Sequence, residues 1–93
     1  MLSREGEVLK VAGPMNINSA ATLLNQSNGQ LNGVKVVDLA GVTEVDSAAV
    51  SLLLEWRRQA QGQTGVQALR FENLPKALTS LADLYGVSEL IPR

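Results

Sequence analysis

The chain has 93 residues, of which 45% are hydrophobic, and it carries a formal net charge of −1 at pH 7. This length predicts one domain spanning residues 1–93. The near-neutral charge and the scattered basic residues argue against binding to nucleic acid or to an anionic membrane surface. The chain has neither cysteine nor histidine, which excludes disulfides, thiolate sites and the common nucleophile–base pairs.

No feature of the sequence predicts a membrane span or a secretion signal. The longest unbroken apolar runs are short, as at Leu52-Leu53-Leu54, and the first ten residues carry charges. We therefore expect a soluble cytoplasmic protein without direct membrane insertion.

The N-terminal segment predicts two short strands. Residues 1–4 are expected to form the first strand and residues 7–12 the second, with a tight turn at Glu5-Gly6 between them. Gly13-Pro14 is expected to end the second strand.

A short helix should follow the second strand. Ala20, Leu23 and Leu24 have the spacing of one apolar stripe. Asn16 and Asn18 are both suited to cap its N-terminus through the side-chain oxygen.

Strands and helices alternate in the rest of the chain. Residues 34–39 are β-branched and predict a central strand covered on both faces. A long helix is expected over residues 47–63, a strand over 66–74, and a last helix from Pro75 to Gly86. The apolar stripe of this last helix is expected to comprise Leu78, Leu81, Ala82 and Tyr85. The order β-β-α-β-α-β-α predicts an α/β fold, with a small, mostly parallel four-stranded sheet flanked by about three helices.

The turn before the long helix carries an acid and a hydroxyl. Asp46 and Ser47 are both favoured N-cap residues, and Asp46 also suits the positive end of the helix dipole. The sequence does not decide which of the two is the cap.

The long helix is apolar over more than one face. One stripe suffices to cover a sheet and comprises Ala49, Leu52, Leu53, Trp56 and Ala60. Trp56 fits either the core or an interface, with the core favoured by its place on this stripe. Further apolar residues lie outside the stripe, and such surface is typical of protein–protein contacts. The predicted partner-binding residues are Ser47, Val50, Ser51, Leu54 and Arg58.

The sequence offers little for catalysis. Metal binding would need Asp38, Asp46, Asp83 and the glutamates, and their spacing matches no known metal loop. Glu44 and Asp46 provide two carboxylates near one turn, so a hydrolase or metal-dependent enzyme is the least favoured alternative. We expect no catalytic activity, no cofactor and no metal.

The stretches "VKVVDL" and "VTEVDSAAVSLLLEW" resemble the STAS domain family, as does the element order. The resemblance covers essentially the whole chain and implies a small sheet flanked by helices. In anti-sigma-factor antagonists of this family, the hydroxyl residue after the Asp is phosphorylated by a partner kinase, which here implies Ser47. Those antagonists usually have Ser or Thr followed by Gly where this chain has Ala48-Ala49.

The ending "LADLYGVSELIPR" is similar to the STAS subunits of bacterial phospholipid-trafficking (Mla) ABC transporters, the MlaB type. This resemblance implies a non-enzymatic subunit, cytoplasmic and peripheral to the inner membrane, that binds the transporter's ATPase and through it the permease. In these subunits the residue at the position of Ser47 contributes to the ATPase contact. Two hypotheses follow, a transporter subunit and, as the alternative, an anti-sigma-factor antagonist switched by phosphate on Ser47.

Overall fold

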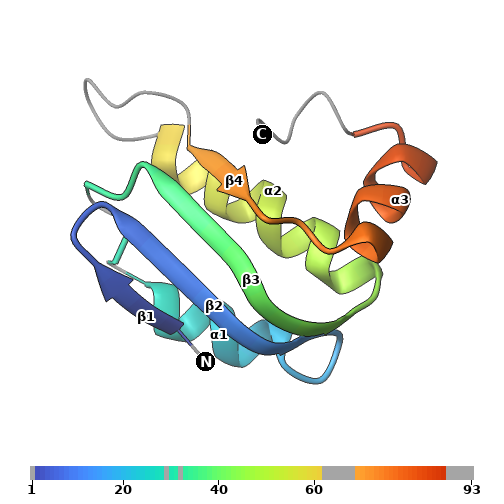
Figure 1. Cartoon of the computed structure of the whole chain (residues 1–93), viewed down its shortest axis with the longest axis horizontal. Coiled ribbons are helices and arrows are strands. Elements are labelled where there is room, and N and C mark those ends of the chain that lie inside the picture. The colour runs from blue at the N-terminus through green and yellow to red at the C-terminus, as the bar shows by residue number, and fades with distance from the viewer. Residues whose placement is uncertain (1, 29, 32, 62–68, 88–93) are drawn as a thin grey trace.

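The computed structural model describes residues 2–28, 30–31, 33–61 and 69–87 (Figure 1). Within these residues the chain forms four strands and three helices in the expected order. Their bounds are β1 Leu2–Glu5, β2 Val8–Met15, α1 Ala20–Ser27, β3 Val36–Val45, α2 Ser47–Gln61, β4 Arg70–Glu72 and α3 Lys76–Leu84.

The four strands form one mixed sheet in the order β1-β2-β3-β4. β1 pairs antiparallel with β2, and a left-handed Gly6 (φ 58°) turns the chain between them. β2–β3 and β3–β4 are parallel, so each pair needs a crossover, which α1 and α2 supply. The predicted fold class, a mostly parallel sheet with three helices, is confirmed.

Both central strands are longer than expected. β2 continues through Gly13-Pro14 to Met15, and β3 continues to Val45, so the expected ends at residues 12 and 39 are wrong. The β2–β3 register shifts between Lys10 and Ala12 and again between Gly13 and Pro14. Irregularities of this kind accommodate a proline, which has no N–H for the regular ladder.

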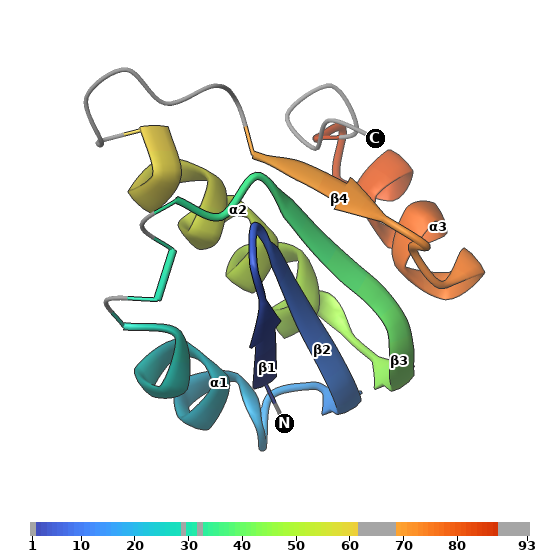
Figure 2. The same cartoon turned by 60° about the vertical axis from the view of Figure 1, so that its left-hand side comes forward.

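In the described part of the chain, helices cover one face of the sheet and not the other, which corrects the expectation for β3. Leu9 and Val11 in β2 and Val37 and Leu39 in β3 are buried, whereas the alternate residue Lys10 is exposed. Figures 1 and 2 show α1 and α2 behind this same face. The reason is topological: consecutive right-handed crossovers that step across a sheet in one direction place their helices on the same side.

The core is built around α2. All five residues of the expected stripe are buried, and Trp56 is completely so, which confirms its core position. The residues expected at the end of this helix (62–63), at the start of the fourth strand (66–68) and in the tail (88–93) lie outside the described part of the chain.

The C-terminal helix α3 packs against α2 near the β4 side of the sheet (Figure 2). Leu78 and Ala82 are buried as expected, but Tyr85 is 51% exposed and does not belong to the core. Tyr85 follows the end of the helix, so it no longer lies on the inward stripe. None of the helices formed by the described residues is long and apolar enough to cross a membrane.

Candidate partner-binding site

The candidate site lies where β2 and β3 end and α1 and α2 begin. The Asp46 amide donates to the carbonyl oxygen of Met15 at 3.4 Å, so the two parallel strands finish side by side. In open α/β sheets the loops at the carboxyl ends of parallel strands commonly form binding sites. Figure 1 shows both strands running into these loops.

Asp46, and not Ser47, caps α2. Its Oδ1 accepts a hydrogen bond from the Ala48 amide at 2.8 Å, which satisfies one of the orphan donors of the first turn. Its Oδ2 accepts a second bond from the Ile17 amide at 3.0 Å. Ser47 is the first helical residue and is exposed, and its hydroxyl makes no hydrogen bond to any described residue.

The loop before α1 is held by its own polar residues. Asn16 Oδ1 accepts hydrogen bonds from the amides of Asn18 and Ser19, before the helix begins. The N-cap of α1 is Ser19 and makes no side-chain capping bond, so the expected cap at Asn16 or Asn18 is wrong. The Ser19 hydroxyl donates to the carbonyl oxygen of Pro14 at 2.8 Å. Ile17 is left projecting outward, 74% exposed. The sequence pattern does not predict a role for Ile17. The feature that could have indicated one is its position between two asparagines, Asn16 and Asn18.

Two grooves flank the exposed side of α2. The first encloses about 510 Å³ between α1 and α2 and the second about 330 Å³ between α2 and the segment after α3. The first groove is lined by Ile17, Ala20, Ala21, Leu24, Ser47, Ala48, Ser51, Leu52 and Glu55. The second groove is lined by Ser47, Val50, Ser51, Leu54, Tyr85 and Val87. Ser47 and Ser51 line both grooves, and we call these two residues the α2 crest.

The structure brings together four of the five predicted partner-binding residues. Ser47 and Ser51 are exposed on the crest, and Leu54 is half-buried in the second groove. Val50 is only 4% exposed, so it belongs to the core and forms part of the groove lining from below. Arg58 is exposed but lines neither groove.

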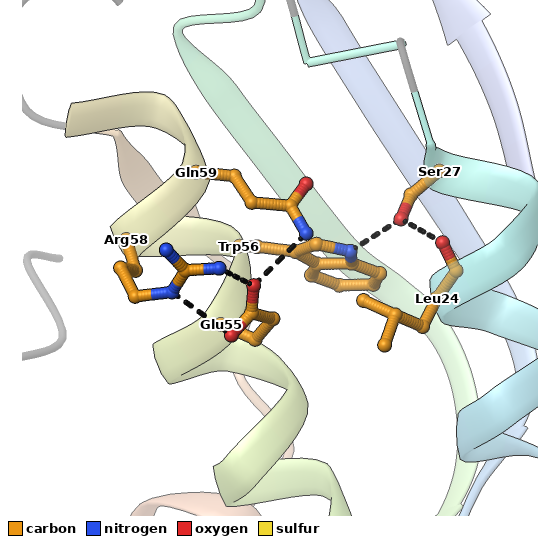
Figure 3. Close-up of polar contacts among 6 residues, drawn as sticks. All are labelled: Leu24, Ser27, Glu55, Trp56, Arg58 and Gln59. Atoms are coloured by element: carbon orange, nitrogen blue, oxygen red, sulfur yellow. Dashed lines mark hydrogen bonds and ion pairs between the residues drawn. The ribbon is translucent and has the colours of Figure 1, made fainter. Parts of the chain in front are cut away.

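Arg58 instead holds the one charged residue of the first groove. Its Nε donates to Glu55 Oε1 at 3.1 Å, and Gln59 Nε2 donates to Glu55 Oε2 at 3.0 Å (Figure 3). These hydrogen bonds lower the pKa of the Glu55 carboxyl, and the contribution of Arg58 is larger than that of Gln59. Glu55 is therefore ionised at neutral pH and already paired.

The candidate site offers an apolar surface with two grooves. Among the described residues, no three acidic side chains gather in a way that could hold a metal ion. Of the two carboxylates near the turn, Glu44 is exposed and Asp46 accepts two backbone hydrogen bonds.

The fold is of the STAS type. A solved structure titled as the anti-sigma factor antagonist SpoIIAA in its unphosphorylated form matches with a TM-score of 0.67 and 15% identity, over 98% of this chain and 84% of that one. The structure of a protein named Mglu matches with a TM-score of 0.59 and 25% identity, over 82% of this chain but only 20% of that one.

The family model described as "Mlab, STAS domain" matches residues 1–92. The chain therefore belongs to the MlaB-type STAS domain family, whose members are generally non-catalytic. No protein with a curated description matches the sequence.

Proposed function

We propose that this chain is a non-enzymatic STAS subunit that binds the cytoplasmic ATPase of a phospholipid-transport ABC transporter. Through the ATPase it would reach the membrane permease and support assembly and activity of the complex. The observation that carries the proposal is the α2 crest between two apolar grooves in a chain of the MlaB type.

The crest and its grooves have the properties of a protein interface. Ser47 and Ser51 are small, so a partner backbone can approach α2 closely and place apolar side chains in the grooves on either side. Tyr85, at the edge of the second groove, is a residue type enriched in interfaces. A large side chain on the crest would hold such a partner away from both grooves at once.

The test is a pair of identical substitutions on opposite faces. Ser47→Arg places a long cation on the crest, whereas Ser3→Arg places it on the exposed strand β1. We expect Ser47→Arg to weaken association with the ATPase by about 100-fold or more, as for a disrupted hot spot, and Ser3→Arg to leave it unchanged. Affinity is measured by titration calorimetry, with circular dichroism to verify folding.

Leu54→Glu provides a second, independent disruption, within the second groove. Normal ATPase binding by folded Ser47→Arg and Leu54→Glu variants would show that the exposed face of α2 is not the contact, whereas absence of binding by the wild-type chain would overturn the proposed function.

The second candidate function is a phospho-regulated anti-sigma-factor antagonist. The exposed Ser47 hydroxyl, without a hydrogen-bond partner among the described residues, supports it. A phosphate there would gain from the positive end of the α2 dipole and would change the charge of the surface. Phosphopeptide mass spectrometry of the chain from its own cells decides between the two: phosphate on Ser47 favours the antagonist, and its absence under varied stresses rejects it.

A further inference from the structure

Ile17 is an apolar residue displayed to solvent by hydrogen bonds. Its side chain is 74% exposed although isoleucine is usually buried. Its amide is held at 3.0 Å by Asp46 Oδ2, a residue that follows a different strand. The same loop is also held by hydrogen bonds between Asn16 and Ser19, and the Ser19 hydroxyl donates to the carbonyl oxygen of Pro14.

The Asp46 carboxylate thereby fixes the relation between two parts of the first groove. One oxygen holds the Ile17 amide and the other caps α2 at Ala48. Ile17 and Ser47 both line this groove, and no continuous element joins them. This side chain therefore links the Ile17 loop to the start of α2, beside the backbone bond between the two strand ends.

We propose that Asp46 is a positioning residue of the partner surface, and that it holds Ile17 at the rim of the first groove as an apolar contact for the ATPase. This inference rests on the proposed function. The ATPase is the expected partner of the first groove because this groove adjoins the α2 crest. Ser47 and Ser51 line both grooves, so a partner that covers the crest necessarily meets the first groove. The part inserted there is uncharged, because Glu55, the charged residue among the described lining residues, is already paired with Arg58.

The contact role of Ile17 is tested with a matched pair of exposed apolar residues. Leu84 is 75% exposed, compared with 74% for Ile17, and it lines neither groove. We expect Ile17→Ser to weaken ATPase binding about tenfold, as for an interface residue of substantial energy, and Leu84→Ser to leave it unchanged. Equal affinities for the two variants would overturn the contact role.

The positioning role is tested with Asp46→Asn. Asparagine has one side-chain oxygen and is a good N-cap, so it keeps the bond to Ala48 and releases the Ile17 amide. Hydrogen exchange followed by NMR should show faster exchange at Ile17 and unchanged exchange at Ala48. ATPase affinity should fall about tenfold, and adding Ile17→Ser should cause little further loss, because residues that act through one contact are not additive.

The outcomes separate this inference from the proposed function. If Ser47→Arg weakens ATPase binding about 100-fold or more while Ile17→Ser and Asp46→Asn leave the affinity unchanged, the function stands and the inference is wrong. If Ile17 exchange is unchanged in Asp46→Asn, the positioning role is wrong. If the wild-type chain does not bind the ATPase, the proposed function and the contact role of Ile17 both fall, and hydrogen exchange still decides whether Asp46 holds the loop.

Discussion

At the scale of single residues, Asp38 shows how one side chain of β3 holds the residue that follows β4. Its Oδ1 accepts hydrogen bonds from the Ala40 amide and from Asn73 Nδ2, both at 2.9 Å. Both hydrogen bonds lower the pKa of the Asp38 carboxyl, and the contribution of Asn73 is larger than that of Ala40. Asn73 has a left-handed backbone (φ 58°), a conformation that asparagine tolerates better than most residues.

Asn73→Gly removes this donor while suiting the backbone. We expect the pKa of Asp38 to rise toward its ordinary value, as measured by NMR titration of the carboxyl carbon. A carboxyl with a lowered folded-state pKa stabilises the protein above its unfolded pKa of about 3.9, and this contribution is lost as pH falls through the folded pKa. The free energy of unfolding of Asn73→Gly should therefore fall less on acidification than that of the wild-type protein.

Asp38→Asn is the control for this prediction, because it removes the titrating group itself. Its urea unfolding should show the acid dependence without the Asp38 contribution. An unchanged pKa of Asp38 in Asn73→Gly would mean that the Asn73 hydrogen bond does not stabilise the charged carboxylate.

At the scale of elements, α1 and α2 are joined by a buried hydrogen bond (Figure 3). Trp56 Nε1 donates to Ser27 Oγ at 2.8 Å, and the Ser27 hydroxyl donates to the Leu24 carbonyl oxygen at 2.8 Å. Both Trp56 and Ser27 are fully buried, so neither polar group can turn to water instead. This bond satisfies the one polar atom of the largest core side chain.

Ser27→Ala leaves the Trp56 N–H unpaired in the core. We expect it to lower the free energy of unfolding by about 1–3 kcal/mol, measured by urea denaturation with the fluorescence of the single tryptophan as the probe. Ser51→Ala is the matched control, because this serine is exposed, and its change should stay within about 0.5 kcal/mol. Equal effects of the two changes would contradict the assigned role of Ser27.

The two long strands, β2 and β3, also approach each other closely at Gly41. A Cβ added at Gly41 would lie 3.0 Å from Ala12 Cβ and 3.1 Å from the Val11 carbonyl oxygen, beside a register shift. Gly41→Ala should therefore destabilise the fold by about 1–3 kcal/mol in thermal or urea unfolding. Ala40→Ser also adds one atom but at an exposed neighbouring position, and it should be nearly neutral.

At the scale of the whole molecule, the two sides of the domain differ in chemistry. The uncovered face of the sheet carries ion pairs, with Lys10 to Glu5 at 2.9 Å and Arg70 to Glu72 at 2.6 Å. The helical side carries the two apolar grooves and the α2 crest. We infer that the proposed partner meets only the helical side.

Lys10→Gln tests whether the partner contacts only the helical side of the domain. It removes a charge from the uncovered face and should leave ATPase affinity within about twofold of wild type, because a change outside an interface has little effect on binding. Its stability should also change little, since Lys10 and Glu5 form a solvent-exposed pair. A large loss of ATPase affinity would place part of the interface on the sheet.

Periodicity and cap chemistry in the sequence determined the element order, the inward stripe of α2 and the Asp46-Ser47 helix start. These features are local, because an apolar spacing or a capping residue acts within a few positions of itself. The same information could not show that β3 is covered on one face only, that Val50 lies inside the core, or that Tyr85 is exposed. A pattern tells which residues share a face, but only the assembled neighbours decide whether that face is covered.

The strand ends and the site depended most on the tertiary structure. The extension of β2 and β3 beyond the expected residues arises from their mutual pairing and its register shifts, which neither strand encodes alone. The bond from the Ile17 amide to Asp46 joins residues 29 positions apart, and it exists because the ends of two parallel strands lie side by side. The sequence by itself therefore determined the order of the elements and the start of α2, whereas only the fold decided where the strands end and which residues share a surface.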